Sequence, residues 1–101
     1  MDHRSYMIIL YDYYKELLTT KQQQYFEGYY FENESLQELS ENYEVSRNAV
    51  HKQVKDAEDK LVEYEKKLGL YQKRIKILQI IDSMDEKIKE QIERNKVNRL
   101  G

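Results

Sequence analysis

Residues 46–55 carry polar side chains of the kinds that bind nucleic acids. Arginine can bond guanine, and asparagine adenine, through two hydrogen bonds at once, so Arg47 and Asn48 are candidate base readers. Lys52 and Lys55 are candidate phosphate contacts that would fix the register on the nucleic acid. His51 could contact either a base or a phosphate. The full set of candidate nucleic-acid-binding residues is Ser46, Arg47, Asn48, His51, Lys52 and Lys55.

These side chains can act together only on a helix, and the sequence predicts a helix-turn-helix over residues 35–54. Ser46 is placed to cap its second helix, whose N-terminus could itself bind a phosphate. In such a unit the second helix enters the major groove of DNA. The alternative is that the two helices pack on each other and bind nothing. Apolar residues at helical spacing line both helices: Leu36, Leu39, Val50 and Val54.

Two further helices are predicted upstream. Apolar residues at helical spacing predict the first over residues 5–18, and Thr20 is placed to cap a second over about residues 21–31. The second is rich in aromatic residues, which most simply form a core or a subunit interface. A platform for stacking bases is the alternative. Neighbouring glutamates disfavour the platform, because they would repel phosphates.

The second helix of the unit continues past residue 54. After Val50 and Val54 its apolar residues continue at heptad spacing with Ala57, Leu61, Tyr64 and Leu68. This spacing predicts a long helix, residues 46–68, packing on something outside the helix-turn-helix. Gly69 is placed to end this helix, and a last amphipathic helix follows over residues 70–95. That helix could fold back on its predecessor or join a second subunit, and its long apolar stripe favours a homodimer. The stripe consists of Tyr71, Ile75, Leu78, Ile81, Met84, Ile88 and Ile92.

A second basic patch surrounds Gly69, with no acidic residue between Lys66 and Gln79. A charge run of this kind is usually a solvated helix end. Contact with the phosphates of DNA or RNA is the alternative. The patch consists of Lys66, Lys67, Lys73, Arg74 and Lys76.

Composition predicts one all-α domain over residues 1–101. The chain has no Pro and three Gly, so little interrupts its helices. Its net charge of −2 is uneven: residues 1–45 hold three basic and nine acidic residues, whereas residues 46–101 hold fourteen basic and ten acidic residues. The acidic part should therefore face away from any nucleic acid.

Several classes of protein are disfavoured by what the sequence lacks. There is no Cys, which excludes disulfides and thiolate chemistry and suits a reducing compartment. No signal peptide is recognisable, and no segment approaches the roughly 20 apolar residues that span a bilayer. The two His lie far apart in sequence, and no catalytic constellation is visible. We therefore expect a cytoplasmic protein without membrane contact, enzyme activity, metal or cofactor.

Residues 17–61 resemble region 4 of bacterial sigma factors. The stretches YFE at 30–32, SLQELS at 35–40 and VSRNAV at 45–50 fill the places of the motifs in that region. The other sigma regions are absent, so the resemblance implies a DNA-binding unit but not a working sigma factor. The entry step of sigma factors, Leu-Pro, is Leu-Thr here.

Nearly the whole chain resembles the YlxM-like family of helix-turn-helix proteins from low-GC Gram-positive bacteria. The matching stretches are YDYYKELLTTKQQQYF near the start and YEVSRNAVHKQVKDAEDKLVEYEKKLGL in the middle. The resemblance implies a link to the signal recognition particle pathway, because genes of this family lie beside the gene for the particle's GTPase protein. Helix-turn-helix units in general usually carry Gly or Asn at the turn position that Glu44 holds here. We expect Glu44 to adopt a positive φ at a cost on the order of 1 kcal/mol.

Together these features favour a dimeric regulator that binds DNA through a sigma-region-4-like helix-turn-helix. The alternative is an adaptor that does not bind DNA and contacts the signal recognition particle's RNA or protein. In the adaptor, the apolar seam of residues 46–68, the second basic patch and the last helix would carry the contacts. The acidic balance and Glu44 favour the adaptor, whereas the Ser-Arg-Asn helix start favours DNA.

Overall fold

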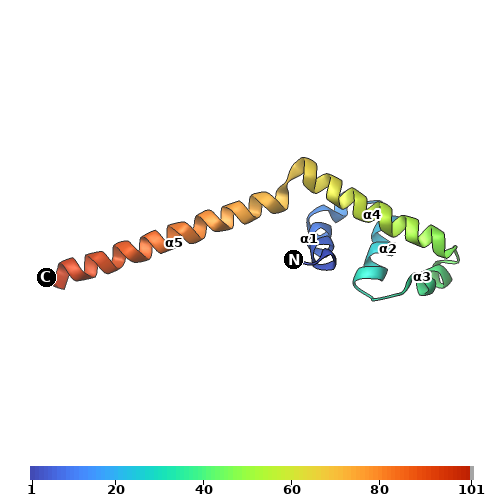
Figure 1. Ribbon diagram of the computed structural model, residues 1–101, viewed down its shortest axis with the longest axis horizontal. Helices are drawn as coiled ribbons and strands as arrows, with labels where there is room; N and C mark the ends of the chain where they lie inside the picture. Colours follow the sequence, from blue (N-terminus) through green and yellow to red (C-terminus); the bar gives the residue numbers. More distant parts are fainter. Residues whose placement is uncertain (101) are drawn as a thin grey trace. The chain divides into compact units, whose positions relative to one another are not determined.

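Helices account for nearly all of the chain, as its composition predicts. The computed structural model describes the backbone of residues 1–100 and the side chains of residues 1–95. The elements, in chain order, are α1 (His3–Tyr14), the 3-10 turn η1 (Lys15–Leu17), α2 (Thr20–Tyr30), α3 (Leu36–Tyr43), α4 (Arg47–Leu68) and α5 (Leu70–Leu100) (Figure 1). No strand occurs within residues 1–100, so the predicted all-α class is confirmed. The contacts divide the chain into two units, with the boundary after Gly69.

The first unit is built around α4, against which α1, α2 and α3 all pack (Figure 1). The apolar heptad positions Val50, Val54, Ala57 and Leu61 are buried by these three helices. The expectation that α4 packs on something outside the helix-turn-helix is confirmed, because α1 and α2 lie outside residues 35–54. The spacing of one helix does not specify which partner covers its apolar face, and here helices of the same chain do so.

Aromatic side chains form the centre of this core. The Phe26 ring lies between the rings of Tyr11 and Tyr30, with ring centroids 4.3 Å apart on each side. Phe26 is fully buried, and both tyrosines are nearly so. These rings are therefore core, and burial excludes them as a platform for stacking bases.

The far end of α4 holds a buried carboxylate. Glu65 is 7% exposed and accepts a hydrogen bond of 2.6 Å from the hydroxyl of Tyr14. The heptad pattern instead placed Tyr64 on the buried side. Tyr64 is only half-buried, and its hydroxyl donates to the carbonyl oxygen of Leu17.

The junction between α1 and α2 differs from the predicted one. The α-helix ends at Tyr14, four residues early, and η1 turns the chain so that Leu18 is buried while Leu17 is exposed. Thr19, and not Thr20, caps α2 by a capping box with Gln22. Gln23 would be the capping-box partner of Thr20, but its side chain instead donates to the carbonyl oxygen of Lys15 at 2.6 Å.

A close approach of α2 and α3 fixes the helix-turn-helix to the rest of the unit. Gly28 faces Leu39, and a Cβ at position 28 would lie 2.6 Å from the Leu39 Cδ2 atom. Leu39 is fully buried there. A side chain at position 28 would therefore require the buried Leu39 side chain to shift, which the sequence pattern did not reveal.

The turn of the helix-turn-helix has the strained backbone expected of it. Glu44 follows α3 with φ 54° and ψ 45°, in the left-handed region that favours glycine. Its N–H donates to carbonyl oxygens of the last turn of α3, and the Val45 N–H donates to the Ser40 carbonyl oxygen at 3.0 Å. The expected positive φ of Glu44 is thus confirmed.

Replacing Glu44 with Gly should raise the free energy of unfolding by about 0.5–1 kcal/mol, because Gly adopts this conformation without a Cβ clash. Thermal unfolding followed by circular dichroism measures the change. The matched control is Glu41→Gly, within α3, which should lower stability by about 1 kcal/mol. Equal changes in both variants would contradict the assignment of strain to position 44.

The second unit is the helix α5, which continues to Leu100 and so exceeds the predicted end at residue 95. Gly101 lies outside the described residues. Within residues 70–95 it exposes large apolar side chains, each about half accessible: Ile77, Leu78, Ile80, Ile81, Met84, Ile88 and Ile92. Among the described residues, no helix combines the length and apolarity that crossing a bilayer requires.

Candidate nucleic-acid interface

The first turn of α4 is an open, capped helix N-terminus. Ser46 has extended backbone angles, and its hydroxyl oxygen accepts a hydrogen bond from the Ala49 N–H at 3.1 Å. This confirms the predicted cap. Ser35 caps α3 in the same way, with Glu38 completing a capping box. The two local caps thus fix the residues at which α3 and α4 begin.

Arg47 and Asn48 project from that first turn. Both are exposed, and neither has a hydrogen bond or ion pair with any side chain in residues 1–95 or with the described backbone. Their full hydrogen-bonding capacity is therefore available to a ligand. In helix-turn-helix proteins the residues near the N-terminus of the second helix contact base edges.

Lys52 and Lys55 are also exposed, but each pairs with an aspartate one turn further along α4. Lys52 lies 3.3 Å from Asp56, and Lys55 lies 3.2 Å from Asp59. Exposed pairs of this kind contribute little to stability, so a phosphate could replace the aspartate. The local field is nevertheless weaker than the spacing of the lysines alone suggests.

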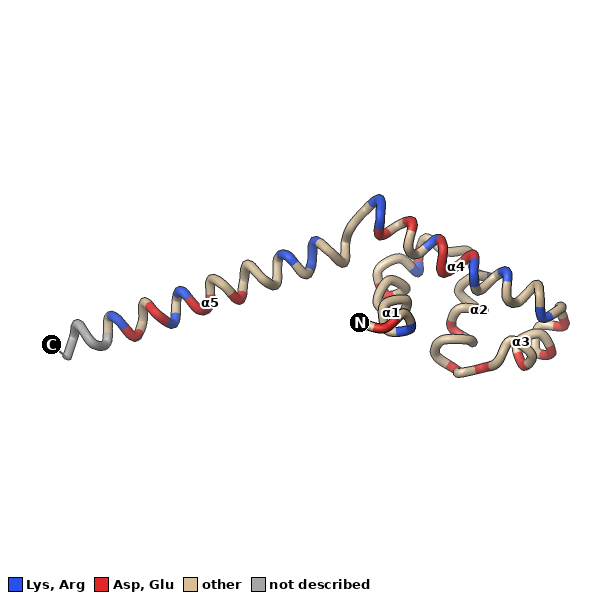
Figure 2. Tube along the Cα trace, in the orientation of Figure 1, with Lys and Arg blue, Asp and Glu red and all other residues tan. Residues whose placement is uncertain are grey.

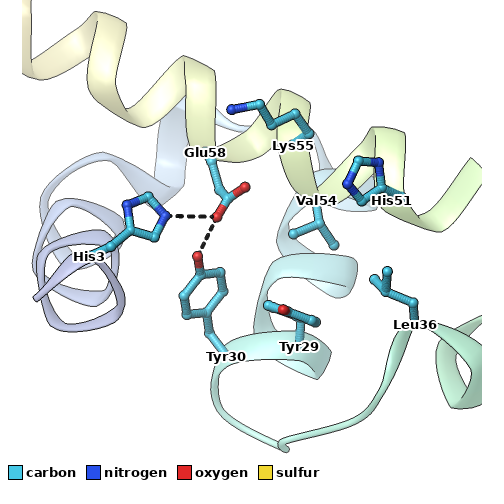
Figure 3. A pocket seen from close by; sticks show the side chains of 8 residues that line it. All are labelled: His3, Tyr29, Tyr30, Leu36, His51, Val54, Lys55 and Glu58. Carbon is cyan, nitrogen blue, oxygen red and sulfur yellow. Dashed lines mark hydrogen bonds and ion pairs between the residues drawn. The ribbon is translucent and has the colours of Figure 1, made fainter.

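His51 lies at the edge of a hollow in the first unit that the sequence did not predict. The hollow, of about 160 Å³, is bounded by α1, α2 and α4 and by the start of α3 (Figure 3). Its lining residues are His3, Tyr29, Tyr30, Leu36, His51, Val54, Lys55 and Glu58. Both histidines of the chain are therefore in one place, which their separation in sequence concealed.

Glu58 occupies the inner part of this hollow. Its Oε2 atom accepts hydrogen bonds from the Tyr30 hydroxyl and from the His3 ring, the latter at 3.3 Å (Figure 3). Burial, and then the bond to Glu58, raise the pKa of Tyr30, which keeps its hydroxyl protonated as a donor. The carboxylate is thus held by two neighbours.

An acidic side borders the interface. Glu38, Glu41 and Glu44 are all exposed on or just after α3. Figure 2 shows acidic positions in red along this helix. In helix-turn-helix proteins the first helix crosses the DNA backbone. Carboxylates there oppose phosphate binding, so only the N-terminal end and adjoining side of α4 suit DNA.

The second basic patch divides between the two units. Lys66 and Lys67 end α4, whereas Lys73, Arg74 and Lys76 belong to α5. Each member is exposed. Lys67 pairs with Glu63 at 2.8 Å, which raises the pKa of Lys67 and lowers that of Glu63. A joint binding role for the five residues stays a prediction.

Comparison with known proteins assigns the chain to a family. A family model described as "UPF0122: Putative helix-turn-helix protein, YlxM / p13 like" matches residues 1–100. A UPF0122 protein of Oceanobacillus iheyensis is 43% identical over 101 residues, covering 95% of this chain and 96% of the relative. One from Listeria innocua is 40% identical over 100 residues, covering 89% and 91%. One from Geobacillus is 46% identical over 80 residues, covering 79% and 73%.

The resemblance seen in the sequence is thereby confirmed, and the capped helices on either side of Glu44 agree with the description of the family. The chain belongs to the UPF0122 family of YlxM/p13-like helix-turn-helix proteins.

Proposed function

We propose that the protein is a cytoplasmic regulator of transcription that binds duplex DNA through the N-terminal end of α4. The observation that carries the proposal is the pair of exposed side chains Arg47 and Asn48, both without partners in the described structure, behind the Ser46 cap. Arg47 would read guanine and Asn48 adenine in the major groove. Ser46, Lys52 and Lys55 would contact phosphates.

A salt titration of binding to three ligands tests this proposal. The ligands are random duplex DNA, the duplex upstream of the protein's own operon, and the signal recognition particle RNA, each followed by fluorescence anisotropy. Binding to phosphates alone weakens steeply with salt, whereas base contacts preserve a preference among sequences. Preference for the operon duplex that persists at higher salt supports the proposal. Failure to bind either duplex overturns it.

The second candidate is an adaptor that contacts the RNA or protein of the signal recognition particle. The acidic residues of α3 favour it, since they lie on the helix that would cross the DNA backbone. The basic patch of Lys66, Lys67, Lys73, Arg74 and Lys76 would then contact RNA. In the same titration this candidate expects preference for the RNA over both duplexes.

We also propose that α5 forms a homodimer. Ile77, Ile81, Met84 and Ile88 follow a spacing of four, three and four residues, as in a two-stranded coiled coil, and all are about half exposed. In an antiparallel pair these positions form a symmetric set of layers, with Ile77 opposite Ile88 and Ile81 opposite Met84. An uncovered apolar stripe of this length is unusual on a soluble monomer.

Replacing Ile81 with Asp should convert the dimer to a monomer at micromolar concentration, because a charge would be buried in the central layer. Sedimentation equilibrium measures the mass. Ser83→Asp, at an exposed position outside these layers, should leave the dimer intact. A wild-type protein that sediments as a monomer would contradict the proposal.

A further inference from the structure

The hollow beside α4 contains both histidines of the chain. His51 and Lys55 come from α4, His3 from the first turn of α1, and Tyr29 from the end of α2 (Figure 3). One ring nitrogen of His3 already bonds Glu58. Its other ring nitrogen, the His51 ring, the Lys55 ammonium and the Tyr29 hydroxyl are donors suited to the oxygens of a phosphate. Two residues far apart in sequence are thus brought to one site.

The start of α1 is held in place beside this site. The Arg4 guanidinium donates to the Tyr30 carbonyl oxygen at 2.6 Å and to the Asn33 side-chain oxygen at 2.8 Å. It also lies over the Tyr30 ring, 5.1 Å from the centroid. These contacts fix the first turn of α1 against the end of α2, and so position His3.

The hollow lies further along α4 than the residues proposed to read bases. Arg47, His51 and Lys55 are four residues apart and share one side of the helix. From Arg47 to Lys55 the helix rises about 12 Å at about 1.5 Å per residue. Lys55 and the hollow therefore lie about two helical turns beyond the residues proposed to read bases. A recognition helix in the major groove runs between the two phosphate backbones that border it.

Charge in the hollow depends on pH. The titratable groups that line it are His3 from α1, Tyr29 and Tyr30 from α2, and His51, Lys55 and Glu58 from α4; α3 contributes only Leu36 to the lining. Arg4 lies beside it, over the Tyr30 ring, and Lys55 pairs with Asp59. The carboxylates of Glu58 and Asp59 offset the charges of Arg4 and Lys55, so a positive charge on either histidine makes the hollow cationic. Histidine is the side chain whose charge ordinarily changes between about pH 5 and pH 8.

We propose that this hollow binds a phosphodiester of the DNA backbone, and that His3 and His51 take up protons when the DNA binds. The inference rests on the proposed function and deepens it. Arg47 and Asn48 read the bases, while the hollow binds a phosphate at the rim of the same groove. Neither the sequence pattern nor the family description assigns His3 to a binding site.

The test measures affinity for a 20-base-pair duplex between pH 8 and pH 6 at constant ionic strength. Wild-type binding should tighten by about tenfold or more, because each proton taken up on binding changes affinity up to tenfold per pH unit. The variant His3→Gln/His51→Gln lacks every histidine of the chain and should lose this dependence. Both side chains are exposed, so the fold should persist, which circular dichroism checks.

A second variant supplies the charge permanently. His3→Lys/His51→Lys should bind at pH 8 about as tightly as wild type binds at pH 6. Arg47→Ala, outside the hollow, should keep the wild-type pH dependence at a lower affinity. Wild-type binding that is independent of pH, or a glutamine variant that retains the dependence, overturns the inference alone. Absence of duplex binding at every pH overturns the proposed function instead.

Discussion

Replacing Phe26 with Ala should lower the free energy of unfolding by about 3–5 kcal/mol, the largest effect we expect from a single substitution. Phe26 is fully buried and stacks on the rings of Tyr11 and Tyr30. The substitution removes its buried apolar surface, both ring contacts and the packing between α1 and α2. Because the free energy of unfolding of a domain is about 5–15 kcal/mol, the folded state of the variant should be only slightly more stable than its unfolded state. Urea unfolding followed by circular dichroism measures the loss.

Phe31 provides the matched control. It belongs to the same aromatic cluster, with its ring 6.2 Å from that of Phe26, but it is 48% exposed. Phe31→Ala should therefore lower the free energy of unfolding by only about 1 kcal/mol, because about half of the side chain's surface is already in contact with water. Similar losses in the two variants would contradict the central place of Phe26. A loss of DNA binding in Phe31→Ala at unchanged stability would reveal a surface role for that ring.

The parts of the fold that the sequence predicts depend on local signals. Ser35 with Glu38, and Ser46 before α4, are caps in which side chain and backbone lie within one turn. The position of Glu44 between two helices required a positive φ, and it has one. Gly69 ends α4 in the left-handed conformation, as the position of a glycine after the last helical residue predicts. Such features need no knowledge of distant segments.

The parts that the sequence did not predict depend on which helices meet. The heptad positions of α4 predicted contacts beyond the helix-turn-helix but not their partners, which are α1 and α2 together with α3. The cap of α2 could have been Thr19 or Thr20, because each has a glutamine three residues later. The choice follows from the bond between Gln23 and Lys15, which depends on how η1 turns.

The candidate site shows the same division. Arg47 and Asn48 were found from helix position and side-chain chemistry, and the structure places both in the open. His3 and Glu58 were missed, although Glu58 follows His51 and Lys55 at helical spacing. Their relevance depends on the packing of α1 beside α4, which no local pattern encodes. The aspartates that pair with Lys52 and Lys55 follow them by four residues, a spacing that a helix brings together and that is visible in the sequence.

Replacing Arg47 with Ala should relax sequence preference by about 1–3 kcal/mol at one base position, which is roughly 5- to 150-fold in relative affinity. The reason is that a two-bond contact to guanine discriminates among bases, and Arg47 is free to make it. A duplex is first enriched from a random library by the wild-type protein. Binding of each variant to that duplex and to duplexes with single base changes then gives the preference at every position.

Lys55→Ala is the matched comparison, because it also removes one exposed cation from the same side of α4. It should weaken binding to all duplexes alike and reduce the slope of log affinity against log salt by about one. The pairing of Lys55 with Asp59 does not prevent this, since exposed pairs are weak enough for a phosphate to displace. Arg47→Ala should instead change the order of preferred sequences. If both variants lower affinity uniformly, Arg47 is a phosphate contact and α4 does not read bases through it.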